Sequence, residues 1–450
     1  MKSITLGNKI SHNKNSQSHF YSIMKKGDFN PSTSMLICGD LFFDERNDYN
    51  FKDIENKFKD NVKDIIKNAD ISLVNLESPT TLSCNKIFKS GPALRMNPLI
   101  LSIIKQTGFD GVTLANNHIM DLGPEGLFDT ISSAKSLGLL TCGAGKNIHE
   151  AIQPIIFQRP DGLRIAVFSF CEKEFGVADE NSPGSAWISH PFALLEIKKY
   201  RDSADFILII AHGGLELVPL SPLERQTQLR NFIEAGADMV IGHHPHVPQG
   251  WENYQGKYIF YSQGNFIFDT YREVHQPGTD WGFVVQLQFD SKSIVGIDLF
   301  LTEQTCGIVQ LMENGFYLNN RIEYLNELSK IVQEPELYLK YWQEIAIRRY
   351  NEQYIHRLSS CFFLQLFNKL FNVIRKYLGR SPSYDTVINS KAIRIDDLAL
   401  LNIIRNESHS WTIKRALSLI TMQELDMRCI DTKPNIDKLL RWATDDNYPT

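Results

Sequence analysis

The chain has 450 residues, a formal net charge of −5, and 43% hydrophobic and 22% charged residues. These values are typical of an ordinary globular protein with about two or three domains. The lack of excess positive charge argues against nucleic acid as a partner. The seven cysteines include no Cys-x-x-Cys pair, which favours reduced thiols and a cytoplasmic protein over a secreted, disulfide-linked one.

Residues 1–32 begin with a polar stretch that lacks the apolar core of a secretory signal. We expect this segment to be a flexible leader. The sequence contains no apolar run of about eighteen residues, which is the length that a membrane-spanning helix needs. We therefore expect a cytoplasmic protein whose membrane contact, if there is one, is peripheral.

From residue 33 onward, short apolar runs alternate with helical patterns. Strands are predicted at 35–38, 71–75 and 112–114, and helices at 51–67, 98–106 and 124–137. This alternation indicates an α/β layered domain. Further along, strands are predicted at 152–157, 164–170, 206–210, 239–241 and 257–262, a helix at 222–235, and an antiparallel pair at 281–289 and 295–302. We expect 33–315 to form one domain with two sheets.

The composition changes near residue 318, where glycine becomes rare and Glu, Leu, Tyr, Arg and Asn dominate. Residues 316–450 are expected to form a helical domain. In 359–380, apolar side chains recur every three or four residues opposite basic ones. Core helices and helices on a membrane surface share this pattern, and we favour the core helix over the membrane contact. The helices are predicted at 319–332, 336–353, 358–378, 394–405 and 408–426.

Polar residues follow the predicted strands. Gly39-Asp40 comes directly after the first strand, and Asn75-Leu76-Glu77 follows the second in the same way. An acid in such a position is either a metal ligand or a turn and helix-cap residue. Two acids along one sheet edge favour the metal ligand, because ligands bind in the crevice at the carboxyl ends of parallel strands.

The segment after the third strand contains Asn116, Asn117 and His118, with Asp121 three residues beyond the histidine. An amide oxygen can ligate a cation, and a neighbouring histidine can protonate a leaving group. The carboxylate of Asp121 could orient the imidazole. The alternative is an asparagine-rich turn that leads into a capped helix.

Two histidines separated by a proline, His244 and His246, form the most specific pattern. Side chains two residues apart in an extended segment point to the same side, and Pro245 favours an extended residue before it. Both imidazoles could then reach one centre with two metal ions. The alternative is a solvated loop.

Two further segments are less specific. His212 to Glu216 follows an apolar run, and its two glycines allow close approach to a ligand, although a lone histidine there could be structural. Asn265 lies in Ser262 to Asp269, where an amide could face an anionic ligand or occupy a hairpin turn.

The order of these segments resembles the bacterial capsule synthesis family, also called the poly-γ-glutamate CapA family. Members of this family carry six motifs in the same order, and the similarity covers about 35–310 of this chain. The matching segments are Gly39-Asp40, Asn75 to Glu77, Ala115 to Gly123, His212 to Glu216, Gly242 to Val247 and Gly264 to Asp269.

The resemblance implies a calcineurin-like metallophosphoesterase fold. This fold is an α/β sandwich of two packed sheets flanked by helices, with two divalent metal ions such as Mn, Fe or Zn. His118 corresponds to the general acid, with Asp121 beside it. The implied metal ligands are Asp40, Glu77, Asn117, His212, His244 and His246, and the residues expected to support them or to bind substrate are Asn116, Glu216, His243 and Asn265.

These observations predict a metal-dependent hydrolase of the calcineurin-like type. Its substrate would be a small molecule or a polymer in capsule, exopolysaccharide or poly-γ-glutamate-type metabolism. The alternative is a non-catalytic metal-binding scaffold or export factor in the assembly of a cell-surface polymer. The sequence leaves the substrate, the metal and the oligomeric state open.

Overall fold

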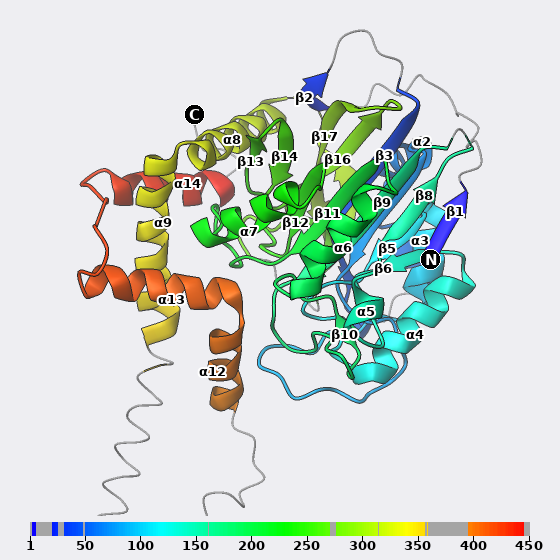
Figure 1. The fold of residues 1–450 in the computed structure, drawn as a ribbon, viewed down its shortest axis with the longest axis horizontal. Coiled ribbons are helices and arrows are strands. Elements are labelled where there is room, and N and C mark those ends of the chain that lie inside the picture. Colours follow the sequence, from blue (N-terminus) through cyan, green and yellow to red (C-terminus); the bar gives the residue numbers. More distant parts are fainter. Residues whose placement is uncertain are drawn as a thin grey trace, which may run out of the picture.

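Two mixed β-sheets pack face to face, with helices on their outer sides (Figure 1). The structure is a computed structural model. A group of C-terminal helices, coloured yellow to red in Figure 1, lies to one side of the sheets. The residues that the structure describes are 2–5, 20–25, 31–47, 50–160, 162–270, 276–313, 315–355, 358 and 395–444.

The first sheet, called sheet A below, has seven strands. Its three central pairings, β9 with β11, β11 with β12 and β12 with β14, are parallel. The strand order is β1 (Lys2–Thr5), β8 (Ile155–Gln158), β9 (Arg164–Cys171), β11 (Phe206–His212), β12 (Met239–His243), β14 (Lys257–Phe260) and β13 (Trp251–Tyr254).

The second sheet, called sheet B, has nine strands. The main order is β18 (Ile308–Leu311), β17 (Ile294–Thr305), β16 (Trp281–Phe289), β3 (Thr33–Phe43), β4 (Ile71–Leu76), β5 (Gly111–Thr113) and β6 (Leu140–Cys142). Two more strands join this path: β15 (Asn265–Asp269) pairs with β3, and β2 (Tyr21–Lys25) pairs with β17. A separate small pair consists of β7 (Ala144–Gly145) and β10 (Gly184–Ser185).

The helices fall into three groups. Those beside sheet B and the neighbouring loops are η1 (Glu45–Asn47), α1 (Phe51–Glu55), α2 (Asp60–Asn68), α3 (Leu99–Thr107), α4 (Gly123–Ser136) and α5 (Ile148–Ala151). Those that contact sheet A are α6 (Pro191–Arg201) and α7 (Leu223–Glu234). The C-terminal group is α8 (Phe316–Gln333), α9 (Pro335–Arg349), the π-helical turn η3 (Tyr350–Tyr354), α12 (Ile395–Arg405), α13 (Glu407–Ile420) and α14 (Thr432–Thr444).

The strand β3 shows how sequence alternation builds the core. Met35 and Ile37 pack in the hydrophobic cluster that includes the strands of sheet A. Leu36 and Cys38 point to the opposite side and pack with Ile66 of α2. Because side chains alternate along a strand, and both faces of sheet B are buried, β3 is apolar along most of its length.

Strands from both sheets end at one edge of the molecule. In sheet B, the parallel pairing of β3 and β4 sets Asp40 beside Asn75, and β15 sets Asn265 beside Asp40. In sheet A, the parallel pairing of β11 and β12 sets His212 beside His243. Polar side chains from distant parts of the sequence therefore gather where ligands usually bind in α/β proteins.

The predicted layered architecture is confirmed, with mixed sheets flanked by helices and a helical C-terminal part. The antiparallel pair predicted at 281–289 and 295–302 is confirmed as β16 and β17. The single helix predicted over 51–67 is wrong, because the chain breaks it between α1 and α2. There, Lys57 accepts from and Lys59 donates to the backbone of Val309 in β18, so pairing with the sheet edge replaces helical hydrogen bonds.

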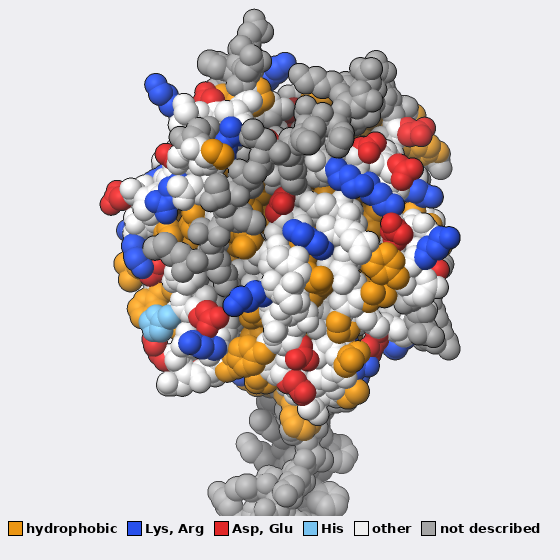
Figure 2. Space-filling model, turned by 90° about the vertical axis from the view of Figure 1, so that its right-hand side faces the viewer, with side chains coloured by type: hydrophobic (Ala, Val, Ile, Leu, Met, Phe, Trp, Pro, Cys, Tyr) orange, Lys and Arg blue, Asp and Glu red, His pale blue; other side chains and the backbone are white. Residues whose placement is uncertain are grey.

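Two other predicted segments are described only in part. Within 1–32, β1 pairs with β8 and β2 pairs with β17. The segment 359–380, for which a core helix or a membrane contact was predicted, lies outside the described residues. None of the helices in the described part combines the length and hydrophobicity that crossing a membrane requires. On the face shown in Figure 2, acidic and basic side chains are interspersed among the described residues.

Gly242 offers a test of the close strand packing at this edge. A Cβ atom there would overlap the backbone carbonyl of Tyr261, which cannot move as a flexible side chain would. We expect Gly242→Ala to lower the free energy of unfolding by about 1–3 kcal/mol, the usual cost of overpacking. Urea denaturation followed by circular dichroism would measure it, and an unchanged midpoint would show that the strands are less tightly held than described.

Candidate metal centre

Asp40 lies at the centre of the site and is fully buried. Its Oδ1 accepts a hydrogen bond from Asn75 Nδ2 at 2.7 Å and lies 3.0 Å from His243 Nδ1, while Oδ2 accepts from the His244 backbone N–H at 3.0 Å. Burial alone would raise the pKa of Asp40, but the hydrogen bond with His243 and the nearby imidazoles lower it below its ordinary value. Asp40 is therefore an ionised carboxylate.

Glu77 follows β4 directly and is also fully buried. Its backbone N–H donates to the Leu41 carbonyl at 3.0 Å, which fixes the residue at the sheet edge. Among the described residues, neither carboxylate oxygen has a hydrogen-bond partner. Oε1 lies 3.5 Å from His212 Nε2 and 3.8 Å from His246 Nε2. Burial, reinforced by the charges of Asp40 and Glu216, raises the pKa of Glu77 well above its ordinary value.

Two imidazoles and an amide oxygen meet beside Glu77. His212 Nε2 lies 3.1 Å from Asn117 Oδ1 and 3.2 Å from His244 Nδ1. Burial lowers the pKa of both His212 and His244 well below the usual value, so both are neutral, the form that ligates metals. A bound cation would compensate this group of acceptor atoms, whereas the protein alone leaves Glu77 without a donor.

The potential ligand atoms form overlapping groups. Glu77, His212 and His244 form one group, and Asp40, Glu77 and His246 form another; within each group the ligand atoms lie within 4.8 Å of one another. A third group consists of Glu216, His244 and His246. Nitrogen and carboxylate ligands of this kind suit zinc, iron or manganese. The residues fit a centre of divalent metal in which Glu77 is shared.

The backbone around the two histidines is not extended, as predicted, but turns sharply. His244 has φ of 99° and His246 has φ of 59°, so the prediction of an extended segment is wrong. The turn is held by the His244 N–H bond to Asp40 and by Leu217 N–H donating to the Pro245 carbonyl. Such unusual backbone conformations are held in place by their surroundings and often occur at functional sites.

His118 lies beside this centre and, among the described residues, belongs to none of the three groups. Its Nδ1 is 2.7 Å from Asp121 Oδ2, and Lys89 Nζ is 2.6 Å from Asp121 Oδ1. Burial and the charge of Lys89 lower the pKa of His118, against the opposing effect of Asp121. The Asp121 carboxylate therefore holds both the imidazole and the ammonium group.

The predicted supporting residues lie around the ligands. Asn116 donates to the Leu76 carbonyl and accepts from the His118 backbone, so it braces the loop. Asn265 Oδ1 is 2.9 Å from His246 Nδ1, and its amide donates to the Thr279 carbonyl. His243 contacts Asp40, and the exposed Glu216 lines the cavity beside His244.

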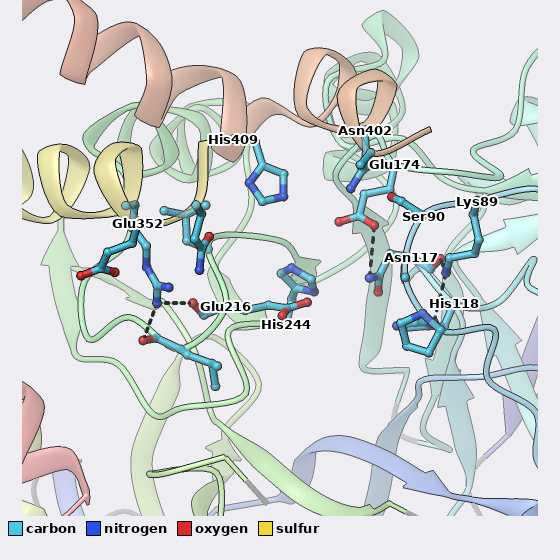
Figure 3. Close-up of a pocket in the computed structure, with 17 residues that line it drawn as sticks. Lys89, Ser90, Asn117, His118, Glu174, Glu216, His244, Glu352, Asn402 and His409 are labelled. Atoms are coloured by element: carbon cyan, nitrogen blue, oxygen red, sulfur yellow. Dashed lines mark hydrogen bonds between the residues drawn. The ribbon is translucent and has the colours of Figure 1, made fainter. Parts of the chain in front are cut away.

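A cavity of about 650 Å³ opens over the centre (Figure 3). Lys89, Asn117, His118, Glu174 and His244 line it from the two-sheet domain. The opposite side comes from the C-terminal helices, through Arg349, Glu352, Gln353, Ala399, Asn402 and His409. Sequence reasoning missed Lys89, Glu174 and all the helical residues, because no motif or spacing relates them to the strand ends.

The family comparison agrees with the motif positions. The profile described as bacterial capsule synthesis protein PGA_cap matches residues 34–270. The chain belongs to this family. The predicted resemblance is thereby confirmed, and the matched range of the PGA_cap family ends before the C-terminal helices.

Two curated relatives match part of this PGA_cap chain. The capsule biosynthesis protein CapA of Bacillus anthracis is 32% identical over 255 residues, which are 53% of this chain and 61% of the relative. The PGA biosynthesis protein CapA of Bacillus subtilis (strain 168) is 35% identical over 213 residues, which are 46% of this chain and 56% of the relative. The chain thus spans less than two thirds of either relative.

Among solved structures, a hypothetical protein from Thermus thermophilus covers 60% of this chain and 100% of its own. Its TM-score is 0.36 and its sequence identity 13%, which is too low a similarity to support a conclusion about fold or function.

Glu77 gives a test with opposite signs in the two metal states. Glu77→Gln removes a buried carboxylate that lacks a donor, so we expect the metal-free protein at alkaline pH to gain about 1–3 kcal/mol of stability. The same change should lower bound metal from about two equivalents to one or fewer. Thermal denaturation after chelation and elemental analysis would measure both effects.

Glu216→Gln is the matched control, because Glu216 is exposed and its replacement should leave the stability of the metal-free protein unchanged. A metal-free Glu77→Gln variant that is less stable than wild type would mean that Glu77 has a partner inside the protein and is not waiting for a cation.

Proposed function

We propose that this PGA_cap protein is a metal-dependent hydrolase of the calcineurin-like type. The observation that carries the proposal is Glu77, a fully buried carboxylate without a hydrogen-bond donor that faces three histidines. A pair of divalent ions, such as Mn, Fe or Zn, would supply an activated water and stabilise the negative charge that develops in the transition state.

The substrate class follows from the relatives and from the cavity. Two relatives are named for capsule and PGA biosynthesis, so we propose an ester or amide bond in a cell-surface polymer of that kind, or in one of its intermediates. A cavity of about 650 Å³ suits one unit of a small molecule or polymer. It has both basic and acidic side chains on its lining, which suits a polar substrate.

His118 is placed to protonate the leaving group. Asp121 binds Nδ1 of the ring, which leaves Nε2 for the substrate side, and His118 lines the cavity beside Asn117 (Figure 3). Lys89 neutralises Asp121 and places a positive charge at the cavity wall. Proton transfer by a positioned histidine contributes typically about 10²–10⁴-fold to a rate.

The proposal is tested by metal loading followed by hydrolysis assays. Purified protein would be chelated, reloaded with Mn²⁺, and assayed on a generic phosphodiester and on a γ-glutamyl amide. Metal-dependent turnover of either substrate supports the hydrolase. Stoichiometric metal binding without turnover of both would instead favour the non-catalytic scaffold or export factor in polymer assembly.

The role of His118 makes a separate prediction. His118→Asn should lower kcat by about 10²–10⁴-fold, while the metal content stays near that of wild type, because His118 lies outside the ligand groups. Steady-state kinetics and elemental analysis on the same sample would measure both. If the metal is lost with the activity, His118 is a ligand and the assignment as general acid is wrong.

A further inference from the structure

The N-terminus of α13 docks onto the loop that follows β9. Three successive residues at this terminus, 406–408, each bond to one part of the segment 172–174. The Glu407 carboxylate accepts from the Lys173 backbone at 2.9 Å and from Trp187 Nε1 at 2.6 Å. Ser408 Oγ donates to Glu172 Oε1 at 2.7 Å. Asn406 and Ser408 are almost completely buried, so this is a specific contact and not a loose surface one.

The third contact continues to the metal centre. Asn406 Nδ2 donates to Glu174 Oε1 at 3.2 Å, and Asn117 Nδ2 donates to Glu174 Oε2 at 3.4 Å. Asn117 Oδ1, on the other side of the same amide, lies 3.1 Å from His212 Nε2. Arg405 Nη1 also donates to the Glu174 backbone carbonyl at 3.3 Å. Glu174 therefore stands between the C-terminal helices and a predicted metal ligand.

The orientation of an asparagine amide depends on such a partner. The oxygen and nitrogen of the amide are nearly equal in size, and only hydrogen bonding decides which one faces the ligand. A carboxylate accepts but does not donate, so Glu174 holds the Asn117 nitrogen and leaves Oδ1 for the metal. Because both Asn117 and Asn406 present NH₂ groups, a glutamine at 174 could accept from only one of them through its single oxygen.

We infer that Glu174 is a positioning residue for the metal ligand Asn117, and that Asn406 of the C-terminal helices fixes Glu174 for this purpose. The inference rests on the proposed metal centre. It reaches beyond the PGA_cap match, which ends at residue 270, and it makes the C-terminal helices part of the metal centre as well as of the cavity. Residues that orient metal ligands typically change metal affinity or activity by about 10–100-fold when mutated.

The test compares three variants of the full chain by titration with Co²⁺, whose visible absorption reports the ligands. Glu174→Gln should weaken Co²⁺ binding by about 10–100-fold and change the absorption spectrum. Asn406→Ser should act in the same direction. A serine keeps an acceptor for the His409 N–H, which Asn406 now caps, but lacks the amide donor to Glu174.

Ser408→Ala is the matched control. It removes an equally buried bond of the same helix terminus, to Glu172 and not to Glu174, so Co²⁺ affinity and spectrum should stay as in wild type. The inference is overturned if Asn406→Ser and Glu174→Gln bind Co²⁺ like wild type, or if Ser408→Ala weakens binding as much as Asn406→Ser. Circular dichroism checks folding, and Asn406→Ser decides the matter if Glu174→Gln does not fold.

This readout separates the inference from the proposed activity. Wild-type protein that binds Co²⁺ but hydrolyses nothing refutes the hydrolase, and the variants still decide the role of Glu174. Wild-type protein that binds no Co²⁺ refutes the metal centre and this inference with it.

Discussion

The buried carboxylate of Asp40 joins the two sheets at the site. It lies on sheet B and accepts hydrogen bonds from Asn75 of the next strand and from the His244 backbone at the end of β12 in sheet A. A fully buried charge is tolerated only when donors surround it. The ends of β3, β4 and β12 must therefore keep their places, and the geometry of the site and the packing of the sheets become one constraint.

The same edge also gathers groups that the protein does not neutralise by itself. Glu77 is buried without a donor, and neutral imidazoles and an amide oxygen face it. Such an arrangement is unfavourable in a protein without a cation, and it costs further free energy in the turned backbone of His244 and His246. Metal binding would offset this free energy, which is why the fold can keep the arrangement.

The C-terminal helices change how the site should be viewed. They lie outside the range matched by the family, yet Arg349, Asn402 and His409 form one side of the cavity. Arg349 also donates to the backbone carbonyls of Glu216 and Leu217, on the loop after His212. A substrate that reaches the centre must therefore fit against these helices, and specificity within the family can differ where the helices differ.

The sequence by itself determined the strand-end motifs, the order of the strands and helices in the two-sheet domain, and the family. It could do so because alternation along a strand and residues next to a strand end are local properties of the chain. It also allowed Asp40, Glu77, Asn117 and the histidines to be brought together in a prediction, since parallel strands end at one edge.

Only the tertiary structure decided the rest. The break between α1 and α2 arises because Lys57 and Lys59 pair with β18, about 250 residues away along the chain. Lys89, Glu174 and Asn406 acquire their places through contacts between segments that share no spacing or period. Hydrogen bonds of this kind depend on how distant surfaces dock, and no local pattern in the sequence records that docking.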